Sequence, residues 1–278
     1  MAMVINTNMA SENAVRLLDQ SSRDQKISME RLTSGLRINK TADDAAGKAV
    51  VTRMDSQVRG TDMALRNAQD GINVIQTMDG AAEEVVNMLQ RIRELGIQAA
   101  NDTYTSANRA QMNQEVSQLK SEIDRVASVT KFNGIHLMNS SAQNSVQLSF
   151  HVGWETGAVN QIKVSLDNFQ TASIGISAGH NITTQSKALI MVNRVDGAIS
   201  HISTLRSKWG AVQNRLESTI SNLQNVNENI KNSRSQIEDT DFARESANLA
   251  RTQVLQQAGM SMLSQSNQQA QNVMQLLK

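Results

Sequence analysis

The 278-residue sequence contains neither cysteine nor proline. Without cysteine the chain can form neither a disulfide framework nor a thiolate metal site, so its folding does not depend on the redox compartment. Without proline it lacks the residue that most strongly interrupts a helix. These two absences favour long, uninterrupted helices.

Aromatic residues and net charge are also scarce. Aromatics make up 3% of the chain, and 27 basic residues against 26 acidic ones leave a net charge of +1. Such a balance provides no long-range attraction for nucleic acid or for an anionic membrane. No apolar run approaches the roughly 18 residues of a membrane-spanning helix. We therefore expect no nucleic-acid partner and no membrane partner.

The sequence also offers no catalytic motif. His136, His151, His180 and His201 are far apart, and none begins a His-Glu-x-x-His zinc motif. Neither a glycine-rich phosphate loop nor a Gly-x-Ser-x-Gly elbow is present. A carboxylate pair at Asp43-Asp44 is better interpreted as a solvated turn or subunit contact, because adjacent helical residues point apart. We predict no enzyme activity, no cofactor and no metal.

Apolar residues at seven-residue spacing are the dominant pattern in the chain. One stripe is interrupted at Asp79, and a second is regular throughout its length. Such a repeat keeps one face of a helix against a partner helix. The predicted bundle core consists of Val58, Leu65, Ile72, Ile202, Trp209, Leu216, Leu223 and Ile230.

A single segment of the chain alternates like a β-strand. Apolar residues occupy every second position over 146–152 and again over 162–166, with Gly153 and Gly157 between them. This pattern predicts a β-hairpin over about 145–167. The Ser/Thr-rich stretch that follows, 168–184, is predicted to be a loop.

The two ends are predicted to be helices with sparse apolar ladders. Thr240 or Asp241 is positioned to cap the last helix. Neither ladder can be buried by its own helix, so both ends are expected to be disordered in the monomer and to fold between subunits. The residues assigned to this inner coiled coil are Leu18, Leu32, Phe242, Leu249, Leu263 and Leu277.

Several segments closely resemble signatures of bacterial flagellins. The stretch 34–47 reads SGLRINKTADDAAG, which resembles the N-terminal signature of that family. Further similar blocks, in the family's order, lie at 90–95, 122–126, 132–134, 237–242 and 253–259. The resemblance covers 1–140 and 185–278, and the short middle resembles a form without outer domains.

The resemblance implies a mostly α fold: a long antiparallel coiled-coil helix bundle with one β-hairpin and paired termini. Residues 1–44 and 241–278 would form the inner coiled coil, and 45–240 the helical bundle with its hairpin. The implied function is a filament subunit for swimming motility. Two alternatives stay open: a hook-filament junction protein, and a cytosolic coiled-coil scaffold.

The resemblance also implies location and partners. Members of the family are secreted unfolded through the flagellar type III apparatus, which fits a start, residues 1–9, without the basic and apolar segments of a signal peptide. The product is expected in the extracellular flagellar filament. Expected partners are further copies of the chain, sister flagellins, an export chaperone, the filament cap and hook-associated proteins.

Two sets of residues match positions that host receptors bind in flagellins. Arg91, Leu95 and Glu115 match the contact of an animal Toll-like receptor, with an inter-subunit contact as the alternative. Asp43, Asp44 and Gly47 match the core of the peptide that a plant receptor kinase recognises, with linker packing as the primary interpretation. Gly96 departs from the family's usual alanine, at a cost of about 1 kcal/mol inside a helix.

Overall fold

A computed structural model describes residues 8–139, 147–177 and 179–276, with side chains described as far as residue 268. The chain divides into two compact units, one formed by residues 1–58 with 228–278 and the other by 59–227. These boundaries fall inside long helices. The domain boundaries proposed from the sequence, after residues 44 and 240, lie instead at breaks between helices.

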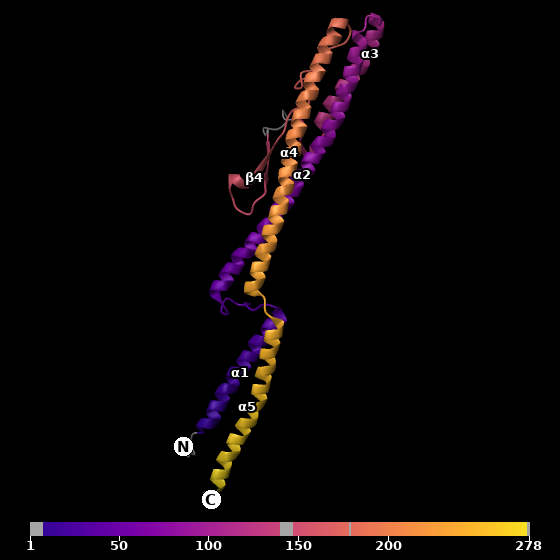
Figure 1. The fold of residues 1–278 in the computed structure, drawn as a ribbon. Helices are drawn as coiled ribbons and strands as arrows, with labels where there is room; N and C mark the ends of the chain where they lie inside the picture. The colour runs from indigo at the N-terminus through magenta and orange to yellow at the C-terminus, as the bar shows by residue number, and fades with distance from the viewer. Residues whose placement is uncertain (1–7, 140–146, 178, 277–278) are drawn as a thin grey trace. The chain divides into compact units, whose positions relative to one another are not determined.

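Helices dominate both units, which confirms the predicted fold class. The helices are α1 (Met9–Ser34), α2 (Ala45–Ala100), α3 (Ser106–Val129), α4 (Gln185–Glu238) and α5 (Phe242–Leu276). In Figure 1, α1 and α5 run side by side, and α2 is followed by α3 and later α4 along the chain. The absence of proline is consistent with 56 uninterrupted residues in α2 and 54 in α4.

Polar side chains and one glycine mark the helix ends. The Asn8 side chain accepts a hydrogen bond from the backbone N–H of Ser11 at the start of α1. Gly35 ends that helix with φ of 72°, a left-handed conformation that favours glycine. Of the two candidates for the α5 cap, Asp241 is the one used, because its Oδ1 accepts from the backbone of Ala243 at 2.9 Å.

The heptad stripes form most of the core that they predict. Ile72, Ile202, Trp209 and Leu216 are buried in the second unit, and Leu223 is buried there too. Val58 is buried in the first unit, where Ile230 is only half-buried.

Leu65 is also only half-buried, so its assignment to the core was wrong. The neighbouring Ala64 and Ala68 take the buried positions. A straight helix has 3.6 residues per turn, so a strict seven-residue stripe drifts by about 20° per heptad and its members move toward the edge of the contact.

Trp209 is the largest buried side chain of the second unit. Its indole Nε1–H donates to the carbonyl oxygen of Ser165 at 3.1 Å. Its ring stacks on Phe169, with centroids 5.9 Å apart. Asp79, which interrupts the heptad stripe, forms a two-point ion pair with Arg206, with Oδ1–Nε at 2.6 Å and Oδ2–Nη2 at 3.1 Å. The interruption is therefore a polar contact at the edge of the core.

The predicted hairpin is present and packs on α2. Strands β3 (Gln147–His151) and β4 (Gln161–Ser165) pair antiparallel, and a 3-10 turn, η2 (Ala158–Asn160), precedes β4. A Cβ added to Gly71 of α2 would lie 3.2 Å from the ring of Phe150. The Asn67 side chain donates to the His151 carbonyl at 3.0 Å. The glycine thus allows the strand to approach the helix closely.

A second, shorter hairpin was not predicted. Strands β1 (Lys131–Phe132) and β2 (Ile135–His136) pair antiparallel across a two-residue turn. In this turn Asn133 has φ of 47° and Gly134 has φ of 80°. An Asn-Gly pair between two apolar residues is a strong hairpin signal, so the sequence contained the information.

The stretch 168–184 is irregular, as predicted, yet much of it belongs to the core. Ile176 and Ile182 are buried, although the composition of the stretch is rich in Ser and Thr. Asp124 of α3 accepts hydrogen bonds from the backbone N–H and the hydroxyl of Thr171, at 2.7 and 2.9 Å. Asn113 accepts from the backbone of Ile182 at 3.1 Å. These bonds fasten the loop along α3.

Gly96, the departure noted above, has a packing reason. A Cβ at this position would lie 2.9 Å from Val192 Cγ2 of α4, closer than side chains tolerate. Glycine lowers the helix propensity at this position, but it allows α2 and α4 to lie in close contact.

We predict that Trp209→Ala lowers the free energy of unfolding by about 3–5 kcal/mol, because it opens a cavity and leaves the Ser165 carbonyl without its donor. Leu189→Ala, at an exposed position of the same helix, is the control and should change stability by less than about 0.5 kcal/mol. Urea unfolding followed by circular dichroism measures both. Equal stability losses in the two variants would contradict the assigned core.

Candidate assembly site

The first unit is the candidate functional site, because helices from both ends of the chain meet there. Within the described residues, no group of three or more His, Asp or Glu side chains could hold a metal ion. No helix in the same ranges is apolar and long enough to cross a membrane.

Helices α1 and α5 pair antiparallel (Figure 1). Near the start of α1, Asn8 Nδ2 donates to Ser266 Oγ at 3.3 Å. Farther along, Ser21 Oγ donates to the Thr252 carbonyl at 3.1 Å. The buried and half-buried positions of both helices recur every seven residues, as expected for a coiled coil.

The seam between α1 and α5 combines small and polar side chains with a few leucines that are only half-buried. The fully buried residues in the described parts of these two helices are Ser28, Glu245 and Thr252. Glu245 lies 3.9 Å from Arg31, measured from Oε2 to Nη1. No large apolar side chain of α1, or of α5 as far as residue 268, is fully buried. The pair therefore buries little apolar side-chain surface completely on its own.

The predicted ladder residues occupy several different environments. Leu18, Leu32, Leu249 and Leu263 are half-buried on the seam. A Cβ on Gly259 would lie 3.0 Å from Leu18 Cδ2, so this glycine allows the two helices to approach. Phe242 is 57% exposed and does not join the seam, because it begins α5 where α1 has already ended. Leu277 lies outside the described residues.

The large apolar side chains of the pair point outward. A groove of about 540 Å³ runs between the two helices and is lined by Leu17, Leu18, Leu255 and Met262, among others. The exposed apolar residues of the pair are Met9, Val15, Leu17, Ile27, Met29, Phe242, Val254, Leu255, Met260 and Met262. Helices that leave this many large apolar side chains on their outer faces need other partners to cover them.

Backbone pairing ties together the two segments that leave the α1–α5 pair. Leu36 forms an antiparallel bridge with Asp239. The backbone N–H of Arg37 donates to the Glu238 carbonyl at 2.6 Å, and that of Thr240 donates to the Gly35 carbonyl at 3.0 Å. No periodic pattern of residues indicates this pairing.

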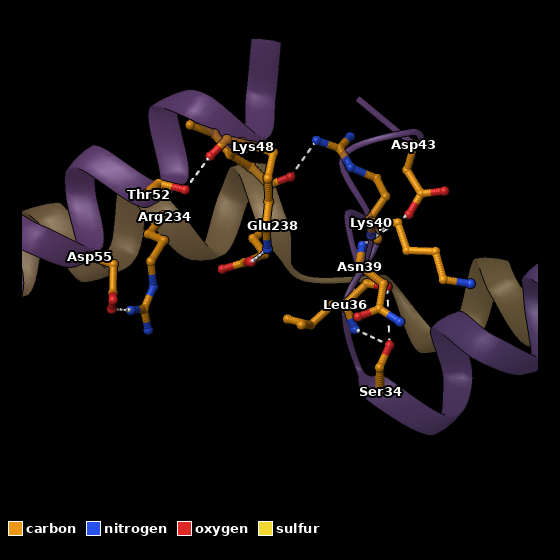
Figure 2. Close-up of polar contacts among 12 residues, drawn as sticks. Ser34, Leu36, Asn39, Lys40, Asp43, Lys48, Thr52, Asp55, Arg234 and Glu238 are labelled. Atoms are coloured by element: carbon orange, nitrogen blue, oxygen red, sulfur yellow. Dashed lines mark hydrogen bonds and ion pairs between the residues drawn. The ribbon is translucent and has the colours of Figure 1, made fainter. Parts of the chain in front are cut away.

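Asp43 and Asp44 hold the turn that leads into α2, and Figure 2 shows Asp43 beside Lys40 and Asn39. Asp43 Oδ2 accepts from the backbone of Lys40 at 2.8 Å and of Asn39 at 3.1 Å. The hydrogen bond from the Lys40 backbone is the main reason that the pKa of Asp43 lies below its ordinary value. Asp44 Oδ1 accepts from the backbone of Gly47 at 2.9 Å and so caps α2.

Gly47 lies in a tight position under this cap. A Cβ there would lie 2.4 Å from Asp44 Oδ2 and 2.8 Å from Ile38 Cδ1. Ile38 is buried. The three residues matched to the plant-receptor peptide, Asp43, Asp44 and Gly47, therefore all have structural roles in the linker.

Two ion pairs join the start of α2 to the end of α4 within the same unit (Figure 2). Lys48 Nζ lies 2.8 Å from Glu238 Oε1, and Arg234 Nη1 lies 3.0 Å from Asp55 Oδ1. Sequence reasoning missed these four residues, since charged pairs on facing helices leave no periodic signature. They fix the ends of the helices that flank the linker.

The residues matched to the animal receptor lie in the second unit and do not form one surface. Arg91 Nε lies 2.8 Å from Glu115 Oε1, and Arg91 Nη1 lies 3.0 Å from Glu94 Oε2, all on exposed side chains. Glu115 is the main reason that the pKa of Arg91 is raised. Leu95 is only 2% exposed and belongs to the core, so of the three matched residues only Arg91 and Glu115 are accessible.

Comparison with known proteins finds the same protein family at both ends of the chain. The sequence model of the bacterial flagellin N-terminal helical region matches residues 5–143, and that of the C-terminal helical region matches residues 192–277. The chain is 42% identical to a flagellin of Halalkalibacterium halodurans, over 99% of this chain and 100% of that protein. It is 38% identical to the flagellar filament 33 kDa core protein of Treponema phagedenis, with the same coverage.

Solved structures support the fold. The crystal structure of Bacillus cereus flagellin matches with a TM-score of 0.51 at 28% identity, covering 57% of this chain and 88% of that one. A protein of Vibrio parahaemolyticus described as flagellar hook-associated matches with a TM-score of 0.59 at 13% identity, covering 71% of this chain and 100% of that one. At that identity the second match concerns the fold alone.

We predict that Gly47→Ala weakens the start of α2 by about 1 kcal/mol, because the added methyl group displaces the Asp44 cap. Hydrogen exchange of the amides in residues 45–52 should accelerate accordingly. Gly80→Ala is the matched control on the same helix, since a Cβ there meets nothing within 4 Å. It should stabilise the helix by about 1 kcal/mol. Slower exchange at 45–52 in Gly47→Ala would refute the steric argument.

Proposed function

The chain belongs to the bacterial flagellin family and is a non-enzymatic structural subunit of the flagellar filament; from this premise we propose that copies join through the α1–α5 pair. The observation that carries the proposal is the distribution of apolar side chains on the pair. The buried seam residues are polar, the seam leucines are only half-buried, and many other large apolar side chains face outward. Burial of those side chains contributes about 25 cal/mol per Å² of apolar surface.

The arrangement of these side chains favours contacts with more than one neighbour. Val254 and Leu255 are adjacent on α5 and therefore lie about 100° apart around the helix. Met260 and Met262 are two positions apart and therefore lie about 200° apart. All four are exposed. A single partner could not cover them together, whereas several copies packed around each pair could.

We also propose that the pair gains most of its stability from the polymer. In dilute monomer, α1 and α5 are held together by hydrogen bonds and by leucines that are only half-buried, and such contacts contribute little net free energy in water. Limited proteolysis should therefore trim both ends of the monomer and spare them in the filament. Ends that resist cleavage equally in both states would contradict this proposal.

We predict that Leu255→Asp reduces polymer to less than about a tenth of the wild-type amount at equal protein concentration, because a carboxylate would be buried in an apolar contact. Leu189→Asp is the control, since Leu189 is similarly exposed on α4 but lies in the other unit. Seeded assembly measured by sedimentation and electron microscopy decides between them. Normal filaments from Leu255→Asp with intact helix content would refute the assignment of the surface.

The exposed apolar side chains of α1 and α5 are also suited to binding proteins other than further copies of this chain. We propose that an export chaperone covers part of the pair before secretion, and that the filament cap and hook-associated proteins contact it at the ends of the filament. The resemblance supports export without a cleaved signal peptide and a filament that includes sister flagellins. The names of the relatives favour a filament protein over a hook-filament junction protein, and over a cytosolic scaffold.

A second proposal concerns recognition by an animal flagellin receptor. The ion pair between Arg91 and Glu115 is exposed and bridges α2 and α3. With Leu95 buried, these two charged side chains are the accessible part of the matched set. Recognition of Asp43, Asp44 and Gly47 by a plant receptor would require the segment to leave the hydrogen bonds that hold its turn.

We predict that Arg91→Ala with Glu115→Ala lowers receptor signalling by monomer at least about tenfold, the effect expected when a charged anchor is lost from an interface. Arg125→Ala with Glu122→Ala is the control, because this exposed pair on α3 forms a similar contact at 2.6 Å. A reporter-cell assay measures the response. Full activity of the Arg91/Glu115 variant would eliminate this surface as the receptor contact.

A further inference from the structure

Methionine is the only sulfur-containing residue in this chain. The sequence has 14 methionines and no cysteine. Peroxides transfer one oxygen atom to a thioether, giving a sulfoxide, and the peroxide is reduced to water or an alcohol. Because no thiol competes for the oxidant, the response of the protein to peroxide depends on which methionines are accessible.

Two groups of the described methionines lie at opposite extremes of exposure. Met78, Met138 and Met191 are completely buried in the second unit. On the α1–α5 pair, Met262 is 66% exposed and Met260 is 64% exposed. Met9 and Met29 on the same pair and Met63 on α2 are more than half exposed. Accessible sulfur is therefore concentrated on the helices proposed to assemble.

Met262 differs from the other exposed methionines in its surroundings. It lines the groove between α1 and α5 together with Leu17, Leu255, Ala258 and Gly259. Positions 255, 258, 259 and 262 share one face of α5, since helical residues three, four and seven apart are neighbours. A thioether at this place is an apolar group within an apolar strip.

We propose that Met262 is an oxidation-sensitive control point for assembly: its sulfoxide forms in the free subunit and blocks polymerisation until it is reduced. This inference depends on the proposed assembly surface. The added S=O group is a strong hydrogen-bond acceptor. Leu17, Leu255, Ala258 and Gly259 have no side-chain donor for it, whereas the polar residues Asn13 and Gln20 line another part of the groove. Covering the apolar strip by another copy would then bury a polar group against apolar side chains, which opposes association.

The state of the subunit determines when the reaction occurs. In the free chain the sulfur faces water and oxidant. In a filament that covers the groove, the same sulfur is shielded. Oxidation therefore acts on subunits before assembly and spares those already assembled, and a reductase specific for methionine sulfoxide restores competence.

The test uses the wild-type chain after partial oxidation with hydrogen peroxide. The treated subunits are added to filament seeds, and peptide mass spectrometry measures sulfoxide at each methionine in the sedimented and soluble fractions. Sulfoxide at Met262 should be at least about tenfold scarcer in the filament than in the soluble fraction, as expected for an unpaired polar group in an apolar contact. Met78, Met138 and Met191 serve as internal standards that stay unoxidised.

A matched pair of variants assigns the effect to one position. Met9→Leu with Met29→Leu and Met260→Leu retains Met262, whereas the same protein with Met262→Leu added does not. Peroxide should block assembly of the first and spare the second, and treatment with methionine sulfoxide reductase should restore the first. Equal Met262 sulfoxide in both wild-type fractions, or equal sensitivity of the two variants, would overturn the proposal.

The assembly proposal fails in a distinguishable way. If untreated wild-type subunits do not extend the seeds, or if Leu255→Asp assembles normally, the proposed surface is wrong whatever peroxide does. If untreated wild type assembles and Leu255→Asp does not, while oxidised Met262 enters the filament freely, the surface stands and only the oxidation-sensitive position is rejected.

Discussion

The assembly behaviour depends on how apolar side chains are distributed around α1 and α5. A typical amphipathic pair directs its large apolar residues into the shared seam and so stabilises itself. Here Ser28, Glu245 and Thr252 occupy the most buried positions, and Leu17 and Leu255 face outward. Most of the large apolar side chains of this pair can therefore be buried only when subunits associate, and folding of the single chain leaves them exposed. The second unit has the opposite organisation, with Trp209 and other large apolar side chains enclosed among its helices.

Much of the helical fold could be predicted from the sequence, because seven-residue spacing reports which face of a helix meets another helix. Trp209 and Leu216 were located in this way. The method fails where drift of the helix changes the contact face, as at Leu65, and where backbone conformation determines the structure, as at Asn133-Gly134. The burial of Ile176 within the predicted loop was missed because the apolar residues of this loop follow neither helical nor strand periodicity.

The candidate site was harder to predict, because spacing identifies a seam but does not say what the other faces do. The ladder through Leu249 and Leu263 was located, yet the outward-facing Leu255 was not recognised. Arg91 and Leu95 illustrate the same limit: helical residues four apart differ by about 40° in direction, enough for one to be exposed and the other buried. The ion pair of Lys48 with Glu238 joins residues 190 positions apart, which single-sequence patterns cannot connect.

A subunit that must remain soluble before it polymerises faces opposing requirements. Apolar surface is needed for association, but one large continuous patch promotes uncontrolled aggregation. In α5 the exposed Val254 and Leu255 are followed by Gln256 and Gln257, and Met262 is followed within four residues by Ser264, Gln265 and Ser266. Such interruption keeps each apolar strip narrow, so that only a partner in the correct register covers several strips at once. Specific association then follows from cooperative burial across many weak contacts, since each strip alone contributes too little to hold a misplaced neighbour.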